Sequence, residues 1–331
     1  MQDRLIDLLL LPDLYLARWL PRRPRLINGQ SSKLAYIDPS YHEKTKSSAF
    51  LLEYLRQFLD VEVILDDRWR GLPLPDLSFI DESYRAVMFF QTQPNGALLK
   101  QIRNDNILFV PMYDSDWSQG YKFWRTLRRI KILNFSRTLD DRLRKWGLQT
   151  MYVQYFPEPA EFLPGQQDEV FFWQRVAALN INVLAELFQI EDVKIHIHKA
   201  VDPYEAFVEP SPQDEERFGI SYSDWFETRD GLWDVMREKG IYIAPRVREG
   251  IGMSFLEAMA MGKAVVAVGQ PTMNEYIEHG RTGYLFELDR PEKLDLANVA
   301  DVQRNAYEYI ARGYALWQEE KKKIMEWVDC E

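Results

Sequence analysis

The sequence predicts an α/β protein made of two successive Rossmann-like domains with a cleft between them. Short apolar segments typical of buried strands alternate with helical segments along most of the chain. A proline-rich segment at residues 156–165 interrupts this alternation, which then restarts. The length of 331 residues favours about two domains. Strands that alternate with helices form right-handed βαβ units, so each domain is expected to contain a mostly parallel sheet.

In the first half, short apolar segments predict strands at residues 34–37, 61–65, 86–90, 107–110, 130–135 and 151–155. Helices are expected at residues 47–58, from a cap at Asn95 to about Arg103, and at residues 138–146. In the second half, strands are expected at residues 170–173, 193–198, 241–244 and 264–268. Helices are expected there at residues 181–188, 232–239 and 255–261. Residues 205–227 form an irregular acidic stretch, and a long amphipathic helix covers residues 302–327.

This pattern divides the chain into four parts. They are an N-terminal arm at residues 1–32, a first domain at 33–160, a second domain at 165–300 and a C-terminal helical segment at 301–331.

The composition excludes some classes of protein. A formal net charge of -10 argues against a nucleic-acid-binding protein, which usually carries a basic patch. No segment reaches the roughly 18–20 apolar residues that span a bilayer. The single cysteine, Cys330, permits no intramolecular disulfide, which fits a reducing compartment such as the cytoplasm.

The N-terminal arm has two interpretations. Its apolar run at residues 5–11 is interrupted by Asp7 and ended by Pro12, and a basic, aromatic stretch around Trp19 follows. An acidic start and the lack of a small-residue cleavage site argue against a secretory signal. The arm either anchors the chain peripherally on an anionic membrane surface, at its inner face, or packs over part of a domain.

The richest chemical signal is the segment R-E-G-I-G-M-S-F-L-E-A-M-A-M-G at residues 248–262, which follows a predicted strand and opens a predicted helix. Gly250 and Gly252 let the backbone adopt positive φ and approach a ligand closely. A helix that begins at Ser254 directs its free N–H groups and its positive dipole end to the same place. This combination suits a diphosphate, because ligands of open parallel sheets bind at the carboxyl ends of the strands.

Two carboxylates flank this loop, and each has more than one interpretation. Glu249 precedes the glycines and Glu257 lies in the first turn, so both can accept hydrogen bonds from sugar hydroxyls. Ser254 and Glu257 also have the S-x-x-E spacing of a capping box, in which Glu257 would only close the helix. Gly262 would then be the helix C-cap and Glu249 a solvated loop residue. A capping box leaves the preceding Glu-Gly-x-Gly unexplained.

The segment resembles a known enzyme family. The spacing Glu249-x7-Glu257 inside E-G-I-G-M-S-F-L-E-A-M-A-M-G-K-A-V-V-A is similar to the retaining GT-B glycosyltransferases of glycosyltransferase family 4. The similarity is strong over residues 241–286, and it includes Glu275, Tyr276, Ile277, Gly280 and Gly283. It implies the GT-B fold, with two Rossmann-like domains facing across a cleft and a C-terminal helix crossing back to the first domain. The first domain would then bind the acceptor and the second the nucleotide-sugar donor.

The resemblance also implies roles for the matching residues. Glu249 would contact the donor sugar hydroxyls near the reacting centre, and Glu257 would bind the nucleotide ribose. The backbone amides of Ile251, Gly252 and Met253 would hold the distal phosphate, and Gly250 is a further donor-binding residue. Family members bind no metal through the protein, so neither a metal site nor a cofactor is expected, and side-chain cations would neutralise the phosphates.

The chain departs from the family at one cation. The family usually has G-R-x4-K after the first strand of its second domain, whereas this chain has Q-R-V-A-A-L-N ending at Asn180. Arg175 is retained, but Asn180 stands where a phosphate-binding lysine is expected. A neutral amide cannot offset the charge that builds on a leaving diphosphate. Either another cation replaces the lysine, with Lys199 and Arg248 as candidates, or turnover is impaired.

Weaker signals lie outside this loop. Asp114 and Asp116 form a D-x-D, a spacing that binds metal in another glycosyltransferase class, but no organisation of that class surrounds it. Asp114 follows a strand and is a candidate for acceptor binding or base-like catalysis; a capped turn is the alternative. His42 lies in the loop after the first strand, which in the family faces acceptor and donor, so it is a candidate hydrogen-bonding residue; an exposed loop histidine is the alternative. His196 and His198 share a strand face, and with no further ligands nearby we expect a packing role.

The sequence thus predicts a metal-independent glycosyltransferase of the hexosyltransferase type. It would move a sugar from a nucleotide-sugar donor to a hydroxyl of a glycan or lipid-linked acceptor, and the resemblance implies retention. Surface polysaccharide or glycolipid assembly is the expected process, with no nucleic-acid partner. Two rival functions stay open. One is a nucleotide-sugar hydrolase or epimerase, and the other is a degenerate protein that binds a nucleotide sugar or a partner transferase without turnover.

Overall fold

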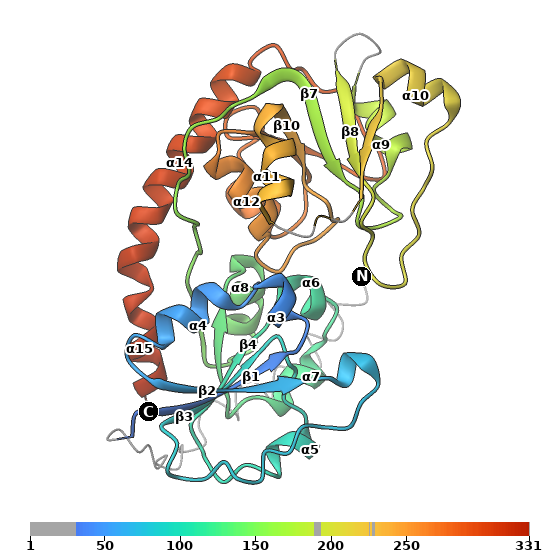
Figure 1. Ribbon diagram of the computed structural model, residues 1–331. Coiled ribbons are helices and arrows are strands. Elements are labelled where there is room, and N and C mark those ends of the chain that lie inside the picture. Colours follow the sequence, from blue (N-terminus) through green and yellow to red (C-terminus); the bar gives the residue numbers. More distant parts are fainter. Residues whose placement is uncertain (1–30, 189–192, 225, 227–228, 331) are drawn as a thin grey trace. The chain divides into compact units, whose positions relative to one another are not determined.

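The computed structural model describes residues 31–188, 193–224, 226 and 229–330, which form two compact units (Figure 1). Unit 1 comprises the described residues up to Gln154 together with those from Glu320 onward. Unit 2 comprises Tyr155–Glu319. Each unit has its own sheet of six parallel strands, so the predicted α/β class and the doubled parallel sheet are confirmed. Nearly all of the predicted N-terminal arm at residues 1–32 lies outside the described residues.

The sheet of unit 1 has the strand order β2-β1-β3-β4-β5-β6. Its strands are β1 (Lys33–Pro39), β2 (Asp60–Asp66), β3 (Ala86–Phe90), β4 (Ile107–Val110), β5 (Lys131–Asn134) and β6 (Thr150–Tyr152). All six correspond to predicted strands. The β3 strand is buried along its whole length, as expected for a central strand covered on both faces. The direction of strand addition reverses between β1 and β3, and open α/β sheets bind ligands beside such a switch point.

Short helices connect the strands of unit 1. They are α3 (His42–Thr45), α4 (Ala49–Leu55), α5 (Gly96–Leu99), α6 (Tyr113–Asp116), α7 (Tyr121–Thr126) and α8 (Arg137–Lys145), with a 3-10 turn η1 (Arg68–Arg70). Asn95 caps α5 as predicted, because its side chain accepts hydrogen bonds from the N–H groups of Ala97 and Leu98. The helix expected to reach Arg103 instead ends at Leu99.

The sheet of unit 2 has the strand order β12-β11-β10-β7-β8-β9. Its strands are β7 (Gln166–Trp173), β8 (Lys194–His198), β9 (Ser221–Ser223), β10 (Lys239–Ile243), β11 (Ala264–Val268) and β12 (Tyr284–Phe286). Strands β7, β8 and β9 add in one direction from β7, and β10, β11 and β12 add in the other. The switch point therefore lies between the central strands β7 and β10.

The helices of unit 2 include two that pack on the central strands. Helix α11 (Arg229–Glu238) contacts β7 and β10, and α12 (Met253–Ala260) contacts β10 and β11. The others are α9 (Ile181–Leu187), α10 (Pro212–Phe218) and α13 (Met273–Tyr276). The prediction of an irregular stretch at residues 205–227 was wrong, because α10 and β9 lie within it. Helix α10 has ordinary end signals: Ser211 caps it, Pro212 opens it, and Gly219 follows it with a φ of 50°.

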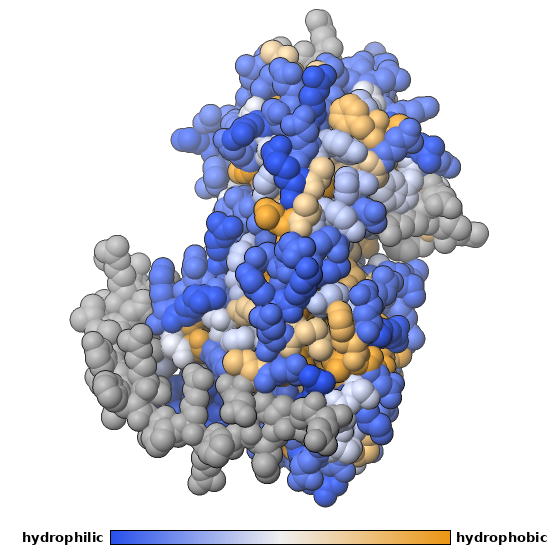
Figure 2. Space-filling model, turned by 90° about the vertical axis from the view of Figure 1, so that its left-hand side faces the viewer, coloured by the Kyte–Doolittle hydropathy of each residue, from blue (hydrophilic) through white to orange (hydrophobic). Residues whose placement is uncertain are grey.

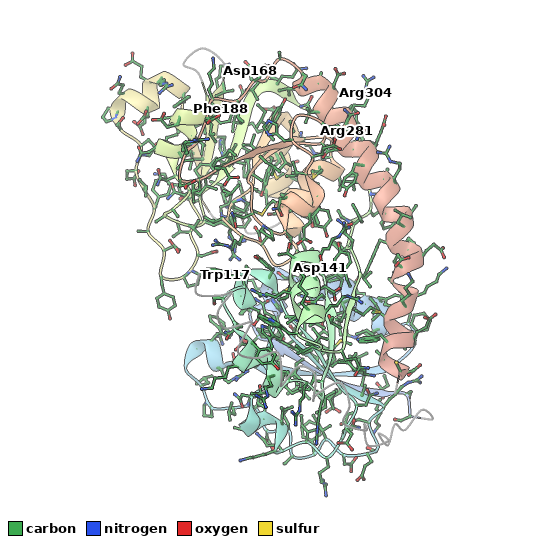
Figure 3. All side chains as sticks on the ribbon, turned by 180° about the vertical axis from the view of Figure 1, so that it is seen from behind. Trp117, Asp141, Asp168, Phe188, Arg281 and Arg304 are labelled. Atoms are coloured by element: carbon green, nitrogen blue, oxygen red, sulfur yellow. The ribbon has the colours of Figure 1, made fainter. Side chains whose placement is uncertain are left out.

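The C-terminal region forms two helices where one was predicted, α14 (Val299–Glu320) and α15 (Lys322–Asp329). Helix α14 is amphipathic. Ile310 and Trp317 on one face are buried, whereas Arg304 on the opposite face is exposed and projects outward (Figure 3).

Helix α15 belongs to unit 1, where a buried lysine donates hydrogen bonds to the carbonyl groups at its C-terminal end. The last carbonyl groups of a helix lack partners within the helix. The fully buried ammonium of Lys131 on β5 donates hydrogen bonds to the carbonyls of Trp327, Val328 and Cys330, at 2.8, 2.9 and 2.9 Å. Arg85 holds the same end through two bonds of 2.7 and 2.6 Å to Asp329. A cation on the sheet thus anchors the negative end of the helix dipole.

One face of the molecule is mainly hydrophilic. Figure 2 shows polar side chains over most of the face in view, with apolar side chains in small separate patches. None of the helices that the structure describes is both long and apolar enough to cross a membrane.

Candidate functional site

The candidate site lies in unit 2, in the loops that follow the strands on either side of the switch point. The loop after β7 carries Arg175, and the loop after β10 carries the two glycines and Glu249. Because β7 and β10 are neighbouring parallel strands, their carboxyl ends meet at one edge of the sheet. The residues predicted from the motif therefore share this edge with Arg175.

The loop after β10 turns sharply into α12. Gly252 has a φ of 84°, and a Cβ atom built there would lie 1.9 Å from the ring of Phe255. Only glycine fits this turn, because an L side chain would be strained and would clash. Gly252 is the N-cap and the helix begins at Met253, one residue before the predicted start at Ser254. Beyond the other end of α12, Gly262 has a φ of 81°, typical of a C-terminal glycine.

The alternative interpretation of Ser254 and Glu257 as a capping box does not hold. Ser254 lies inside the first turn and not at the N-cap, so Ser254 and Glu257 do not hold the positions that such a box requires. The hydroxyl of Ser254 instead forms a hydrogen bond with the phenol of Tyr242, a buried residue of β10. Glu257 therefore does not serve as the glutamate of a capping box.

The predicted charged residues Glu249, Glu257 and Arg175 all affect the pKa of Tyr242. Burial raises its pKa most strongly, and the nearby carboxylates of Glu249 and Glu257 raise it further, whereas Arg175 lowers it. Arg175 and Glu249, from two loops, and Glu257, from helix α12, thus act electrostatically on one phenol near the carboxyl end of β10. Glu249 itself is only 7% exposed, so its carboxylate is largely shielded from solvent.

The loop after β11 supports the loop after β10. The backbone N–H of Glu249 donates to the carbonyl of Pro271 at 3.2 Å, and the hydroxyl of Thr272 donates to the carbonyl of Ile251 at 3.0 Å. Thr272 is fully buried. These bonds hold the backbone on both sides of Gly250, which favours a preformed ligand site over an adaptable loop.

Two arginines beside the switch point share one carboxylate, an arrangement that the sequence interpretation did not include. Asp202, in the loop after β8, accepts from Nη2 of Arg175 at 2.6 Å and from Nη2 of Arg246 at 2.6 Å. Nε of Arg175 also donates to Asp202, at 2.8 Å. The backbone N–H of Asp202 donates to the carbonyl of Arg175 at 2.9 Å. Loops from three strands are therefore linked at one cluster of charges.

The structure places the remaining predicted donor residues as follows. Asn180 caps α9: its side chain accepts from the N–H of Asn182 at 2.9 Å and donates to the carbonyl of Ala177 at 2.8 Å. The ammonium of Lys199 lies 3.4 Å from a carboxylate oxygen of Glu209 and 4.1 Å from the centre of the Tyr222 ring. Arg248 is partly exposed in the loop after β10.

In unit 1, His42 lies beside the switch point between β1 and β3 but is only 3% exposed. Its Nδ1 is 2.6 Å from Oδ1 of Asp38, and Oδ2 of that carboxylate accepts from the hydroxyl of Ser48 at 2.5 Å. The rings of Tyr41 and Phe90 pack edge-on against it. The imidazole therefore presents little surface to a ligand.

The D-x-D segment forms helix α6, and its two carboxylates have different surroundings. Asp116 is fully buried and accepts from the side chain of Gln93 at 2.7 Å and from the N–H of Met112 at 3.2 Å. Burial raises its pKa to about 7. Oδ1 of Asp114 accepts from the N–H of Ser115 at 2.9 Å. Among the described residues, no group of three or more histidine, cysteine or acidic side chains is placed to hold a metal ion.

The two histidines of β8 are hydrogen-bonded to the neighbouring edge strand β9. The ring nitrogens of His196 lie 2.8 Å from the hydroxyls of Ser221 and Ser223, and Nδ1 of His198 lies 2.9 Å from Ser223. The ring of Phe226 stacks on His198 at 4.9 Å between centres. These hydrogen bonds and ring contacts fit the packing role that we expected for both histidines.

Burial lowers the pKa of both His196 and His198 to about 4. Lys239 lowers the pKa of His196 further, whereas the carboxylate of Asp224 opposes the shift at His198. An unfolded histidine has a pKa of about 6.5, so the unfolded chain binds more protons between that pH and about 4. These histidines therefore contribute stability at neutral pH that is lost as the pH falls through this window.

We expect the melting temperature of unit 2 to fall by roughly 5 °C between about pH 6.5 and pH 4.5 through these histidines, at about 1–2 kcal/mol for each. The measurement is calorimetry of the wild type and of the His196→Gln/His198→Gln variant, which should show a flatter pH profile. His279→Gln, at an exposed position, is the control and should keep the wild-type slope. A double variant with the wild-type slope would contradict the assignment.

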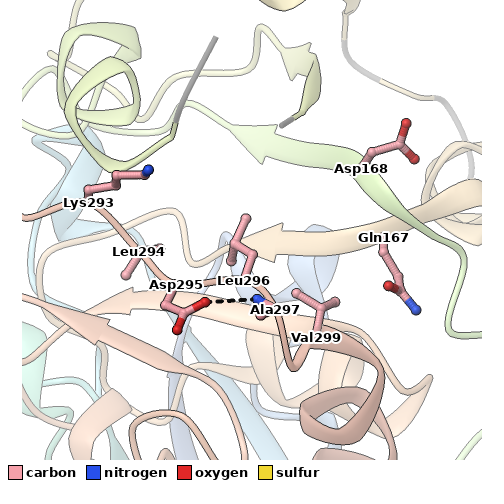
Figure 4. Close-up of a pocket in the computed structure, with 8 residues that line it drawn as sticks. All are labelled: Gln167, Asp168, Lys293, Leu294, Asp295, Leu296, Ala297 and Val299. Carbon is pink, nitrogen blue, oxygen red and sulfur yellow. Dashed lines mark hydrogen bonds between the residues drawn. The ribbon is translucent and has the colours of Figure 1, made fainter. Parts of the chain in front are cut away.

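A cavity of about 560 Å³ lies elsewhere in unit 2 (Figure 4). It is lined by Gln167 and Asp168 at the start of β7, by residues 293–297, and by Val299, the first residue of α14. The carboxylate of Asp295 accepts from the N–H of Ala297 at 3.0 Å. Since this cavity lies at the amino end of β7, it is separate from the loops that carry Arg175 and Glu249.

Comparison with known proteins finds a family match in unit 2, in a segment that includes the loop after β10. Residues 183–299 match the family model described as "Glycosyl transferases group 1". This segment includes Glu249, Glu257 and Arg246, whereas Arg175 precedes it. No protein with a curated description matches the sequence.

The fold is similar to several solved structures. The complex of Anabaena Alr3699/HepE with UDP and glucose has a TM-score of 0.59 at 14% identity, covering 89% of this chain and 100% of that chain. Sucrose-phosphate synthase from Thermosynechococcus elongatus has a TM-score of 0.63 at 13% identity, covering 89% and 98%. A glycosyltransferase from Rickettsia africae has a TM-score of 0.62 at 11% identity, covering 90% and 98%. These similarities establish the GT-B fold for this chain.

Proposed function

We propose that this protein is a glycosyltransferase that moves a sugar from a nucleotide-sugar donor to a hydroxyl acceptor. The observation that carries the proposal is that Arg175 and Glu249 lie in the loops after the neighbouring parallel strands β7 and β10, at the switch point of unit 2. Both Glu249 and Glu257 lie in the segment that matches the glycosyltransferase family model. The structures with the same fold include one bound to UDP and glucose, which supports a nucleotide-sugar donor.

The site offers the chemistry that such a donor needs. The positive end of α12 and the tight turn at Gly252 suit the diphosphate. Arg175 adds a cation there, and charge developing on the leaving diphosphate is stabilised by such preorganised groups. Glu249 would accept hydrogen bonds from the donor sugar, and Glu257 would bind the ribose. In this proposal no protein-bound metal ion neutralises the phosphates.

The finer parts of the proposal extend the family resemblance. Transfer would proceed with retention of the anomeric configuration. Its acceptor would be a glycan or a lipid-linked molecule in surface polysaccharide or glycolipid assembly. The protein would act in the cytoplasm, at the inner face of the membrane. His42 and Asp114 stay predictions for the acceptor side.

The proposal is tested by incubating the full chain with UDP-, GDP- and ADP-sugars and measuring release of free nucleotide. We expect release that depends on an added acceptor, and a glycoside product whose anomeric configuration, read by NMR, matches the donor. Release without an acceptor would support a hydrolase. A protein that neither binds any of these donors nor releases nucleotide from them would refute the proposal.

One observation favours a second candidate, a donor-binding protein without turnover. The amide of Asn180, at the position where a lysine is expected, is used in the cap of α9. Donor binding with no release of nucleotide under any condition would support this candidate.

A further inference from the structure

A β-turn in the loop after β8 carries a tyrosine in an unfavourable backbone conformation. The turn consists of residues 202–205, and a hydrogen bond of 3.1 Å from the N–H of Glu205 to the carbonyl of Asp202 closes it. Pro203 holds its second position, and Tyr204, with a φ of 71°, holds its third. This arrangement matches a type II turn, whose third position favours glycine because a bulky side chain there is strained.

The fold offers nothing that offsets this strain. The side chain of Tyr204 is fully exposed, with a relative exposure of 103%. Within the part of the chain that the structure describes, its ring forms no hydrogen bond and no contact with another ring. Residues held in sparsely populated backbone conformations gather at ligand sites, where the strain serves binding. A contact with a ligand therefore explains this tyrosine better than packing does.

The turn is fixed to the loop that carries Arg175. Oδ1 of Asp202 accepts from Nη2 and Nε of Arg175 at 2.6 and 2.8 Å, and the N–H of Asp202 donates to the carbonyl of Arg175 at 2.9 Å. On the other side of Tyr204, the carboxylate of Glu205 accepts from the N–H of Ala177 at 2.8 Å. Two residues of chain span at most about 7 Å, so Tyr204 is held close to the residue that bonds Arg175.

The turn also lies at the edge of the sheet where the proposed donor site is. Strands β7 and β8 are neighbouring and parallel, so the loops that follow them adjoin. Arg175 and Glu257 both act on the phenol of Tyr242, so the groups proposed for the diphosphate and the ribose lie close together. The next part of a nucleotide beyond the ribose is its base, and an aromatic ring can stack on the face of any base.

We propose that Tyr204 is the residue that stacks on the nucleobase of the donor. This inference rests on the proposed function, because the ligand is taken to be a nucleotide sugar. Since hydrogen bonds on both sides fix the turn before the ligand arrives, little backbone freedom is lost on binding. Stacking of this kind strengthens binding without selecting one base over another.

The test is calorimetric titration of the full chain with UDP, GDP, ADP and CDP. The Tyr204 variants are then titrated with the nucleotide that binds most tightly. For Tyr204→Gly we expect binding to weaken by about 5- to 100-fold, as for loss of one base–aromatic stack. Tyr204→Phe keeps the ring and should bind within about twofold of the wild type. The control is Phe58→Ala, which removes an exposed aromatic ring from unit 1 and should leave the affinity unchanged.

Thermal unfolding distinguishes a lost contact from a damaged fold. Glycine adopts positive φ without strain, so the melting temperature of Tyr204→Gly should be no lower than that of the wild type. A lower melting temperature together with weaker binding would overturn the inference, since the loss would then come from the turn.

Two further results would overturn the inference and leave the proposed function standing. One is equal binding of the nucleoside diphosphate by Tyr204→Gly and the wild type. The other is equally weak binding by Tyr204→Phe and Tyr204→Gly, which would assign the effect to the hydroxyl group and not to stacking. A wild type that binds none of the four nucleotides would overturn the proposed function and this inference together.

Discussion

Replacing Glu249 by glutamine should lower kcat/KM for sugar transfer by about 10²–10³-fold, a loss typical of removing one preorganised polar group from a reacting centre. The side chain is 7% exposed, and its loop is held by Pro271 and Thr272. Glutamine preserves the size of the side chain but removes its negative charge and replaces one acceptor oxygen by a donor. The loss should therefore fall on transfer and not on folding.

The measurement is initial-rate kinetics with the donor found by nucleotide release, together with calorimetric binding of the free nucleoside diphosphate. Since Glu249 is assigned to the sugar, affinity for the nucleotide alone should change by less than about threefold. Glu308→Gln, on the exposed face of α14, makes the same chemical change as a control and should transfer normally. Undiminished transfer by Glu249→Gln would remove Glu249 from the site.

Replacing Lys131 by methionine should destabilise unit 1 by about 3–5 kcal/mol and release helix α15. The substitution leaves three carbonyl groups at the end of α15 without the ammonium that binds them. The carbonyl of Val328 keeps the bond that it accepts from Asn106, so the carbonyls of Trp327 and Cys330 lose the most. A buried acceptor left without a partner costs about 1–3 kcal/mol. Methionine fills much of the same volume, so the effect measures lost hydrogen bonding and not a cavity.

Hydrogen exchange read by mass spectrometry distinguishes local release from general unfolding. In Lys131→Met, amides of residues 322–329 should exchange fastest relative to the wild type, and amides of unit 2 should be unaffected. Lys122→Met, at an exposed position of α7, is the control and should exchange like the wild type. Unchanged protection of α15 in Lys131→Met would show that the ammonium does not hold this helix.

Much of the fold was predictable because parallel strands are buried on both faces and appear in the sequence as short apolar runs. The β3 strand, Ala-Val-Met-Phe-Phe, is such a case. The elements that were missed lack this signal. The β9 strand is Ser-Tyr-Ser at the edge of its sheet, where little of the side-chain surface is buried. Helix α10 was hidden by its acidic composition, although Ser211 and Gly219 mark its ends.

The candidate site divides in the same way. Glu249, Gly252 and Glu257 were predictable because one loop and one helix turn place them together, whatever the rest of the sheet does. The bridge from Arg175 to Arg246 through Asp202 was not, because it depends on β7 lying between β8 and β10. Strand order is a long-range property, and spacing along the chain does not encode it.

The hydrogen bonds from Lys131 to the end of α15 have a consequence for the order of events during synthesis. Lys131 and Cys330 are 199 positions apart, and all of unit 2 lies between the two stretches of unit 1. At about 5–20 residues per second, the ribosome needs about 10–40 s to supply the carbonyl groups after the lysine has emerged. Unit 2 is one continuous stretch and can complete its sheet in that interval. Unit 1 therefore completes its fold last. Of the two units, it is the one that a chaperone acting on nascent chains would bind for longer.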